Sequence, residues 1–410
     1  MELTVHYAPD GPEHLQAVGR LYETAQGRVF FEYDPAWSAG PRELSPLFLP
    51  NSTTGAAVSP TPAFGPLFGL FEDALPDWWG ERLMRRFFGE LGIRWNQVTS
   101  LQKLACGGER KMGALTFSPH LERTSLDDRR TLDIEQMTLA AQAAVDGERS
   151  EILDRLIPSG LTPGGAQPKA LLSFTADFSR IGPTEPPDDS FSPWLLKFEL
   201  HPELHECRVE HAYHLMAAAA GIDVPETRLI SSHDGTRAQF LSRRFDRAAG
   251  GRRIHMHTFS GLTHTPPRDG TDYHDLMNLT RQLTRKHPDV EQVFRRAVFN
   301  IAAGNDDDHG RNHAFLMDPD GTWRLSPAYD LTLVTHPLVA GIRAGAVQGK
   351  MRAITRDDLI RLGDEHGVRR IPQTIDAILD TIAHWPDFAR QAGIPPRITA
   401  DCQDRMPLLS

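Results

Sequence analysis

The sequence predicts an α+β fold in which strands dominate the first half of the chain and helices dominate the second. Apolar runs with the character of strands occur at residues 112–117, 170–174 and 194–199. From Tyr273 onward, apolar residues recur instead with the 3.6-residue period of amphipathic helices. The length of 410 residues, of which 40% are apolar, is enough for two or three buried cores.

The chain divides into three predicted parts. Residues 1–118 form a small β-rich N-terminal subdomain that ends after the strand at 112–117. Residues 119–250 contain a linker helix, which begins at the capping residue Asp133, and a first lobe with a glycine-rich loop. Residues 251–410 form a helical C-terminal lobe. Its predicted helices cover residues 275–285, 290–301, 357–366 and 374–384.

The glycine-rich loop lies in residues 161–169, which read Leu-Thr-Pro-Gly-Gly-Ala-Gln-Pro-Lys and lead into a predicted strand. Glycine amides have no neighbouring Cβ and can approach a phosphate closely, so Gly164 and Gly165 are candidate phosphate-binding residues. An ordinary tight turn also contains such a pair and is the alternative. The segment lacks the Gly-x-x-x-x-Gly-Lys-Ser/Thr pattern, which disfavours a P-loop NTPase.

A single lysine, Lys197, lies within the apolar strand pattern at 194–199. Such a lysine often extends its charge to solvent from the edge of a sheet, but beside a nucleotide it would neutralise phosphate charge. The predicted helix at 206–220 follows the strand and could carry the acid that positions Lys197. Glu210 is the first candidate and Glu206 the alternative, and either could instead be a solvated surface residue.

The most informative segment is 305–312, Asn-Asp-Asp-Asp-His-Gly-Arg-Asn, because it concentrates three carboxylates and two carboxamides. It follows the helix pattern at 290–301, at whose start Asp289 and Gln292 resemble a capping box. After it, two strand patterns joined by an Asp-Pro-Asp-Gly turn indicate a hairpin. We expect this hairpin to return a further acid, Asp330, toward the cluster.

The spacing within this segment matches a phosphoryl-transfer site. Such a site needs one carboxylate to orient the attacking hydroxyl, and a carboxamide with another carboxylate to hold the metal. In protein kinases four residues separate the catalytic Asp from the metal-binding Asn, and here only Asp307, counted to Asn312, has this spacing. Asp306 and Asp308 each miss it by one residue. An acidic surface loop or a calcium site is the alternative, although the EF-hand spacing is absent.

Together these motifs resemble the HipA family of serine/threonine kinases, which are the toxin halves of bacterial toxin–antitoxin pairs. The resemblance covers nearly the whole chain. In the kinase part it rests on Gly-Gly-Ala-Gln-Pro-Lys169, Leu-Leu-Lys197-Phe, Arg244-Phe-Asp-Arg247, Asp307-Asp-His-Gly-Arg-Asn312 and Tyr329-Asp330-Leu. In the N-terminal third it rests on Val18-Gly-Arg-Leu-Tyr22, Phe31-Glu-Tyr-Asp-Pro-Ala-Trp37, Leu44-Ser-Pro46, Phe71-Glu-Asp-Ala-Leu-Pro-Asp-Trp-Trp-Gly80 and Met112-Gly-Ala-Leu115.

The resemblance implies a two-lobed, protein-kinase-like fold and a role for each motif residue. Asp307 would be the catalytic base, with His309 as a structural donor in the same loop, and Asn312 and Asp330 would be the magnesium ligands. The nucleotide would be bound by Lys197, Glu210, Lys169 and the phosphate-proximal residues Gly164, Gly165, Ala166 and Gln167. Thr162 stands where family members can carry a serine whose autophosphorylation ejects the loop and inactivates the enzyme. Here the residue is a threonine followed by proline, and the start of a turn is the alternative role.

By the same resemblance, the chain would be an ATP- and Mg²⁺-dependent protein kinase that acts as the toxin of a type II toxin–antitoxin system. Its substrate would be an aminoacyl-tRNA synthetase, with the glutamyl enzyme as the first candidate, and its partner a HipB-like DNA-binding antitoxin. The net charge of −10 argues against a large basic surface, so DNA contact is expected mainly through the antitoxin. A small-molecule phosphotransferase and a non-catalytic antitoxin-binding co-repressor are the alternatives.

The sequence also predicts a cytoplasmic protein with no membrane contact. The three cysteines, Cys106, Cys207 and Cys402, lie far apart and provide no disulfide framework, as is usual in a reducing compartment. The first residues lack a basic segment followed by an apolar core, and no apolar run approaches the length of a membrane span.

Overall fold

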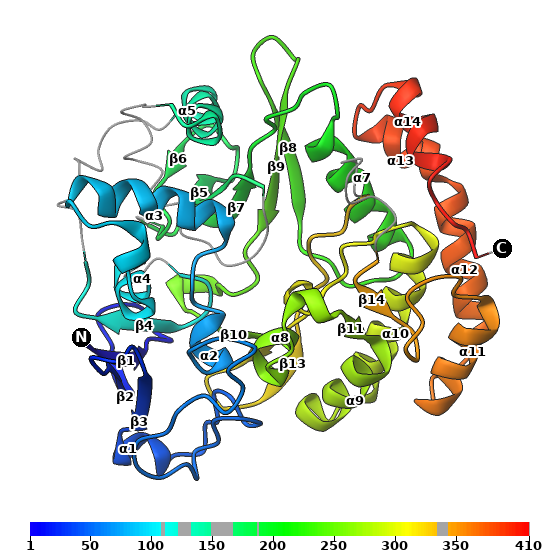
Figure 1. Cartoon of the computed structure of the whole chain (residues 1–410). Helices are drawn as coiled ribbons and strands as arrows, with labels where there is room; N and C mark the ends of the chain where they lie inside the picture. Colours follow the sequence, from blue (N-terminus) through cyan, green and yellow to red (C-terminus); the bar gives the residue numbers. More distant parts are fainter. Residues whose placement is uncertain (108–110, 122–132, 149–166, 187, 334–342, 410) are drawn as a thin grey trace.

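The computed structural model describes residues 1–107, 111–121, 133–148, 167–186, 188–333 and 343–409. The chain runs from a small sheet at the N-terminus, through a five-stranded sheet, to a group of helices that ends at the opposite side of the molecule (Figure 1). The larger sheets are antiparallel, and the last part of the chain, from residue 356 to 403, forms helices alone, which confirms the predicted α+β class.

The N-terminal sheet is antiparallel, with strand order β3-β2-β1-β4. Its strands are β1 Glu2–Tyr7, β2 Gln16–Glu23, β3 Val29–Tyr33 and β4 Leu115–Ser118. In β1, buried Leu3, Val5 and Tyr7 alternate with more exposed residues, which is the period of a strand with one buried face. The helices between β3 and β4 are α1 Pro35–Ser38, α2 Gly69–Glu72, α3 Trp78–Glu90 and α4 Ser100–Cys106, with a 3-10 turn at Trp95–Gln97.

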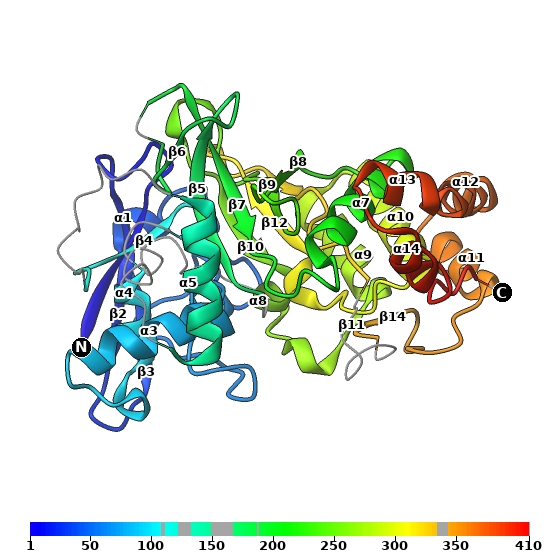
Figure 2. The ribbon, with the colours of Figure 1, turned by 90° about the horizontal axis from the view of Figure 1, so that it is seen from above.

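A five-stranded antiparallel sheet of order β6-β5-β7-β9-β8 forms the first lobe. Its strands are β5 Lys169–Thr175, β6 Ile181–Gly182, β7 Phe191–Lys197, β8 Thr227–Ser231 and β9 Ala238–Arg243. Helix α7 Glu206–Ala219 packs against β8 and β9. Helices α3 and α5 Ile134–Asp146 share a buried apolar cluster with β5 and β7 (Figure 2). A helix from the first 118 residues therefore belongs to the core of the first lobe.

The second lobe is mostly helical. A three-stranded sheet of order β10-β12-β13 and a short parallel pair of β11 and β14 lie beside its helices. The strands are β10 His255–Thr258, β11 Thr271–Asp272, β12 Ala314–Met317, β13 Trp323–Leu325 and β14 Gly345–Ala346. The helices are α8 Phe259–Thr263, α9 Tyr273–Thr284, α10 His287–Ala302, α11 Arg356–Glu365, α12 Ile371–Ala383, α13 Trp385–Gln391 and α14 Pro396–Gln403, and the 3-10 turns are η2 Ala249–Gly251, η3 Pro267–Asp269 and η4 Gly310–Asn312.

The four helices predicted in this lobe are confirmed, with ends that differ by a few residues, and β12 and β13 form the predicted hairpin. The predicted capping box at Asp289 is wrong. Helix α10 begins earlier, at His287, because Pro288 is tolerated in the first helical turn, where an amide has no partner within the helix. The Asp289 carboxylate instead accepts a hydrogen bond from N of Leu325 at 3.3 Å.

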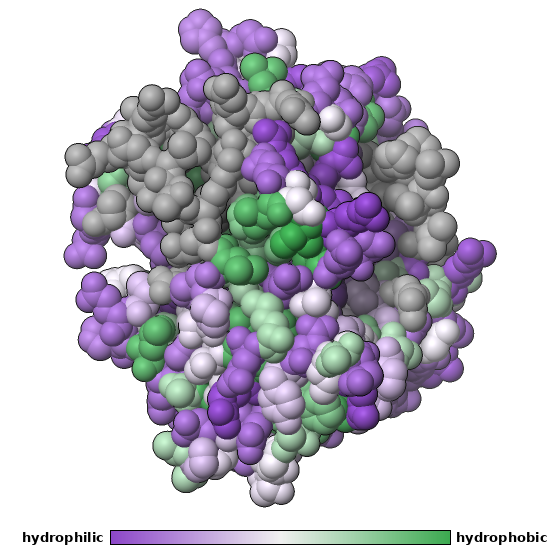
Figure 3. Space-filling model, turned by 60° about the vertical axis from the view of Figure 1, so that its left-hand side comes forward, coloured by the Kyte–Doolittle hydropathy of each residue, from purple (hydrophilic) through white to green (hydrophobic). Residues whose placement is uncertain are grey.

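The surface is mainly polar on the face shown in Figure 3, and apolar side chains gather near the middle of that face. Single large apolar side chains such as Trp78 and Leu139 are also exposed, which is normal for a folded domain. Within the described part of the chain, no helix is both long enough and apolar enough to cross a bilayer.

Candidate active site

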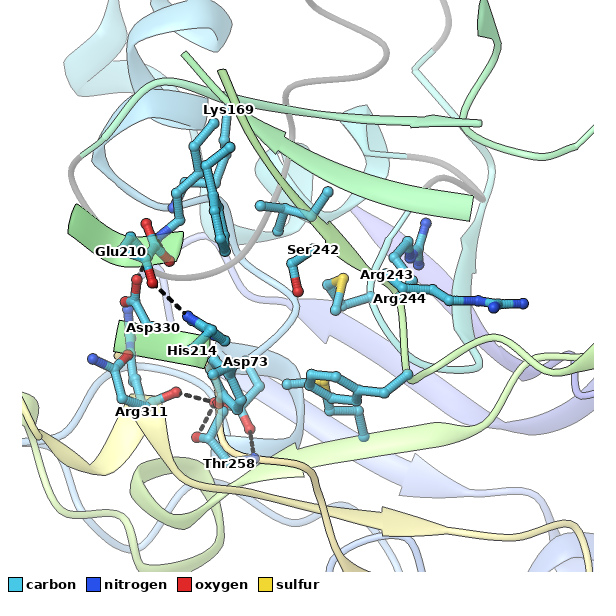
Figure 4. Close-up of a pocket in the computed structure, with 18 of the residues that line it drawn as sticks. Asp73, Lys169, Glu210, His214, Ser242, Arg243, Arg244, Thr258, Arg311 and Asp330 are labelled. Atoms are coloured by element: carbon cyan, nitrogen blue, oxygen red, sulfur yellow. Dashed lines mark hydrogen bonds and ion pairs between the residues drawn. The ribbon is translucent and has the colours of Figure 1, made fainter. Parts of the chain in front are cut away.

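A pocket lies between the sheet of the first lobe and the second lobe (Figure 4). Strands β7 and β9 and helix α7 line it from the first lobe, and strand β10 and turn η4 line it from the second. Glu72, Asp73 and Met112 line it from the N-terminal subdomain. Three parts of the chain that are far apart in sequence therefore build one pocket.

The last residue of β7, Lys197, is paired with two acids at the wall of this pocket. Its Nζ lies 2.7 Å from Oε1 and 2.9 Å from Oε2 of Glu210 on α7, and it also contacts Oδ1 of Asp330. Glu210, and not Glu206, is the acid that α7 directs to the lysine. The Lys197 and Glu210 side chains are buried, whereas Asp330 keeps 26% of its side chain exposed. Asp330 is the member of this cluster that a ligand can most readily reach.

Burial and charge act against each other in this cluster. Burial lowers the pKa of Lys197, but the Asp330 and Glu210 carboxylates outweigh it and raise that pKa above its ordinary value. Burial raises the pKa of Asp330, but Lys197 and then Lys169 hold it well below its usual range. For Glu210, burial is the largest influence and raises the pKa, although Lys197 opposes it. At neutral pH, Lys197 is therefore cationic and Asp330 anionic.

The three consecutive aspartates have different surroundings. Asp308 is fully buried and accepts hydrogen bonds from the Tyr273 hydroxyl at 2.8 Å and from Nη1 of Arg343 at 3.0 Å. Nη2 of the same guanidinium donates to Oδ1 of Asp306 at 2.9 Å. Asp307 lies between them with 58% of its side chain exposed. Arg343 thus binds both flanking acids, and the middle carboxylate is left at the surface.

Asp307 lies close to other charged and polar groups of the site. Partial burial raises the pKa of its carboxyl, His309 lowers it, and Asp330 raises it again. Nε2 of His309 is 3.7 Å from Oδ1 of Asp307, which is longer than a normal hydrogen bond. The side-chain amide of Asn312 donates to the backbone carbonyl of Asp307 at 2.8 Å. This bond orients the Asn312 carboxamide and ties it to the loop that carries Asp307.

The residues present fit a hard divalent cation. Such ions take oxygen ligands, and the Asp330 carboxylate and the Asn312 carboxamide both line the pocket. The backbone of Asp330 has a φ of +58°, a region that residues other than glycine rarely adopt. Strained conformations of this kind cluster at ligand sites, where the surrounding structure maintains them.

The predicted phosphate-proximal loop is described only at its end. Four predicted site residues, Thr162, Gly164, Gly165 and Ala166, lie outside the described residues. Nε2 of Gln167 lies 3.5 Å from the carbonyl oxygen of Phe198, and Gln167 is not among the residues that line the pocket. Lys169, the first residue of β5, does line it.

The Arg244-Phe-Asp-Arg247 motif joins the N-terminal subdomain to the first lobe. The fully buried Asp246 carboxylate accepts hydrogen bonds from Nε and Nη2 of Arg244 at 2.9 and 2.7 Å and from Nη1 of Arg247 at 2.8 Å. It also accepts one from N of Gly113 at 2.7 Å. Both arginines donate to the carbonyl of Lys111 at 3.0 Å. We call this group of five residues the Asp246 cluster.

Sequence reasoning missed several residues in and around the site, and Arg343 and Asp73 are the two with the most charged or polar contacts there. Arg343 belongs to no recognised motif, and the only signal for it was the excess of acids in residues 305–312, which calls for a buried cation. Asp73 lies inside a motif of the N-terminal subdomain, and its carboxylate accepts hydrogen bonds from N and Oγ1 of Thr258 on β10, both at 2.7 Å. Asp73 and Thr258 are far apart in the sequence, so no local pattern could predict this contact.

Comparison with known proteins places these features in a family. The model of the HipA-like C-terminal domain matches residues 161–406, and that of the HipA N-terminal domain matches residues 14–118. "Putative kinase Y4dM" of Sinorhizobium fredii is 29% identical over 206 residues, which is 46% of this chain and 50% of that protein. The "Serine/threonine-protein kinase toxin HipA" of Shewanella oneidensis is 33% identical over 67 residues, 16% of this chain and 15% of that protein. The chain spans about half the length of the curated relatives that it matches over the longest stretches.

The fold has a counterpart among solved structures. A chain of the toxin–antitoxin complex of HipA, HipB and operator DNA from Shewanella oneidensis MR-1 superposes with a TM-score of 0.67. The match is 19% identical and covers 98% of this chain and 95% of that chain, so it bears on the fold alone. The two family models together span most of the sequence, including the pocket residues on β7, α7 and η4. The chain belongs to the HipA family.

Proposed function

We propose that the chain is an ATP- and Mg²⁺-dependent serine/threonine protein kinase. The observation that carries this proposal is that Lys197, already paired with Asp330, lines the same pocket as Asn312. Asn312 is in turn hydrogen-bonded to the backbone of Asp307, the exposed acid of the loop. A lysine, an orienting carboxylate and two oxygen ligands are the parts that phosphoryl transfer needs.

In this reaction the oxygen of an acceptor hydroxyl bonds to the γ-phosphorus while the bond to the β,γ-bridging oxygen breaks, and ADP leaves. Asp307 orients the hydroxyl and accepts its proton. Lys197, held in place by Glu210, contacts the nucleotide phosphates. When bound, Mg²⁺ neutralises phosphate charge, and Asn312 and Asp330 are the residues that would hold it. Positioning and charge neutralisation supply the catalysis.

We further propose a protein acceptor and a role as the toxin of a type II toxin–antitoxin system. An aminoacyl-tRNA synthetase is the proposed substrate class, with the glutamyl enzyme first, on the strength of family resemblance. The matched HipA structure is a complex with HipB and operator DNA, which supports a HipB-like antitoxin as the partner. A net charge of −10 agrees with DNA contact mainly through that antitoxin.

Intact-mass measurement with magnesium ATP, alone and with glutamyl-tRNA synthetase, tests the proposal. The wild-type chain is expected to add phosphate to itself or to the synthetase, and Asp307→Ala and Asp330→Ala to add none. A Thr162→Ala variant that no longer gains phosphate would identify the proposed autophosphorylation site. Transfer only to small-molecule hydroxyls would replace the protein-kinase assignment. Antitoxin binding without any ATP turnover would favour a non-catalytic co-repressor.

A further inference from the structure

The second pocket lysine, Lys169, is held by a residue from the N-terminal subdomain. Its Nζ lies 3.0 Å from Oδ2 of Asp77, and the two side chains are only 5% and 2% exposed. Asp77 is the N-cap of α3, and its other oxygen accepts a hydrogen bond from N of Gly80 at 2.7 Å. The indole of Trp79, on the same helix, donates to the carbonyl oxygen of Lys169 at 2.9 Å. The start of α3 therefore binds both the side chain and the backbone of Lys169.

The two pocket lysines lie directly opposite each other in the sheet. Lys169 on β5 and Lys197 on β7 are paired residues of an antiparallel ladder, so their side chains leave the same face of the sheet. Like charges in this position repel, and each ammonium here has its own carboxylate partner, Asp77 for the first and Glu210 for the second. Both lysines line the pocket. A pair of cations at this spacing suits a ligand with several negative charges in a row, which is what a polyphosphate chain presents.

Burying an ion pair costs free energy, because both charges lose their contact with water. As a result, pairs of this kind often stabilise a fold no better than apolar residues would. Helix α3 already contributes Trp79, Leu83 and Met84 to the apolar cluster over β5 and β7, so packing alone can attach it. The Asp77–Lys169 pair is therefore better explained by what it does to the pocket.

We propose that Asp77 is a positioning residue that holds Lys169 as a second cation for the phosphates of a bound nucleotide, so that the N-terminal subdomain is part of the nucleotide site. This inference rests on the proposed function, because it takes the pocket ligand to be a nucleotide. It adds that a residue of the N-terminal subdomain, at the start of α3, sets the affinity for the phosphate chain. In the nucleotide complex Lys169 keeps one hydrogen of its ammonium on Asp77 and directs the others to phosphate oxygens.

The test uses the full-length chain and the substitution Asp77→Asn, which keeps the capping oxygen for Gly80 and removes only the charge. Calorimetric titration with Mg²⁺ and a non-hydrolysable ATP analogue is expected to show about tenfold weaker binding, because the buried lysine loses its partner. Adenosine, which has no phosphate, is expected to bind with unchanged affinity. In turnover assays KM for ATP rises while kcat changes little. Asp133→Asn, the same substitution at the exposed N-cap of α5, is the matched control and should leave nucleotide binding unchanged.

A double-mutant cycle with Lys169→Met separates positioning from a general effect on folding. If Asp77 acts through the lysine, Asp77→Asn causes no further loss of affinity once Lys169 is replaced. A further loss in the double variant, or an unchanged affinity of Asp77→Asn for the ATP analogue, overturns the inference while leaving the kinase assignment intact. A wild-type chain that binds no ATP analogue overturns both. Should Asp77→Asn fail to fold, Asp77→Ser, which keeps a capping hydroxyl, provides the same comparison.

Discussion

Two groups of buried charges in this molecule, the Asp246 cluster and the group of Lys197, Glu210 and Asp330, both pair carboxylates with basic side chains. They differ in whether a carboxylate stays accessible to a ligand. In the Asp246 cluster both carboxylate oxygens are occupied by guanidinium and backbone donors, and the side chains of its two arginines are at most 1% exposed. In the Lys197 cluster, formed with Glu210 and Asp330, the ammonium is paired with two carboxylates, and one of these acids remains partly exposed at the pocket. A buried carboxylate whose two oxygens are both occupied holds parts of the chain together, whereas charges that face a cavity can exchange a protein partner for a ligand.

The largest effect is expected from removing the charge of Asp307, which, like Asp330, keeps part of its side chain exposed. Asp307→Asn is expected to lower the rate of phosphoryl transfer by roughly 10²- to 10⁴-fold, the usual contribution of a general base. Thermal stability should change little, because the side chain is largely exposed. Steady-state transfer assays and thermal denaturation measure the two effects. Asp306→Asn serves as the neighbouring control and should cost far less activity. Equal losses for the two variants would contradict the assignment of Asp307.

Asp246→Asn should lower the stability of the fold and leave the rate of phosphoryl transfer nearly unchanged. It removes the carboxylate that both buried arginines share, so that Arg244 loses its ion-pair partner and Arg247 keeps only Glu185, and the free energy of unfolding should fall by about 3–5 kcal/mol. Chemical denaturation measures this loss. The transfer rate per folded molecule, corrected for the folded fraction, should stay near that of the wild type. A stable variant with a large loss of transfer rate would show that the Asp246 cluster acts in catalysis, which contradicts the structural role given to it.

Arg343→Lys is expected to have an intermediate effect. Lysine keeps the charge but cannot bind Asp306 and Asp308 through separate nitrogens of one planar group, as the guanidinium does. We expect a loss of about 1–2 kcal/mol in stability from the weakened charged hydrogen bonds, together with a lower kcat from a less ordered Asp307. Affinity for nucleotide should be unchanged, and a changed Kd with normal kcat would argue against this role.

The smallest expected effect is on the pH dependence of stability. Burial raises the pKa of Asp246, but Arg244 and Arg247 outweigh it and hold the pKa at about 2. A depressed pKa in the folded state adds stability above the unfolded value, near 4, and that stability is lost as the pH falls toward about 2. The stability difference between wild type and Asp246→Asn should therefore shrink as the pH is lowered from about 5 to 3. A constant difference over that range would show that Asp246 does not titrate as the cluster requires.

Local patterns in the sequence predicted the parts of the site that depend on spacing along one segment. The interval from Asp307 to Asn312, the helix with Glu210 and the hairpin that leads to Asp330 are all short-range features. The prediction of a capping box at Asp289 was wrong, because helix α10 begins earlier, at His287, and tolerates Pro288 in its first turn. The family relation, too, was predicted from motifs within the sequence. The two family models that match residues 14–118 and 161–406 confirm it.

By itself, then, the sequence determined which residue types are present and how they repeat, and therefore the α+β class and the motif residues of the candidate site. Only the tertiary structure decided which charges meet. Arg343 reaches two acids that lie about 35 residues earlier in the chain, Asp77 reaches Lys169, and Asp73 reaches Thr258. The physical reason is that a buried charge needs a partner, yet periodicity along the chain does not encode which distant segment supplies it.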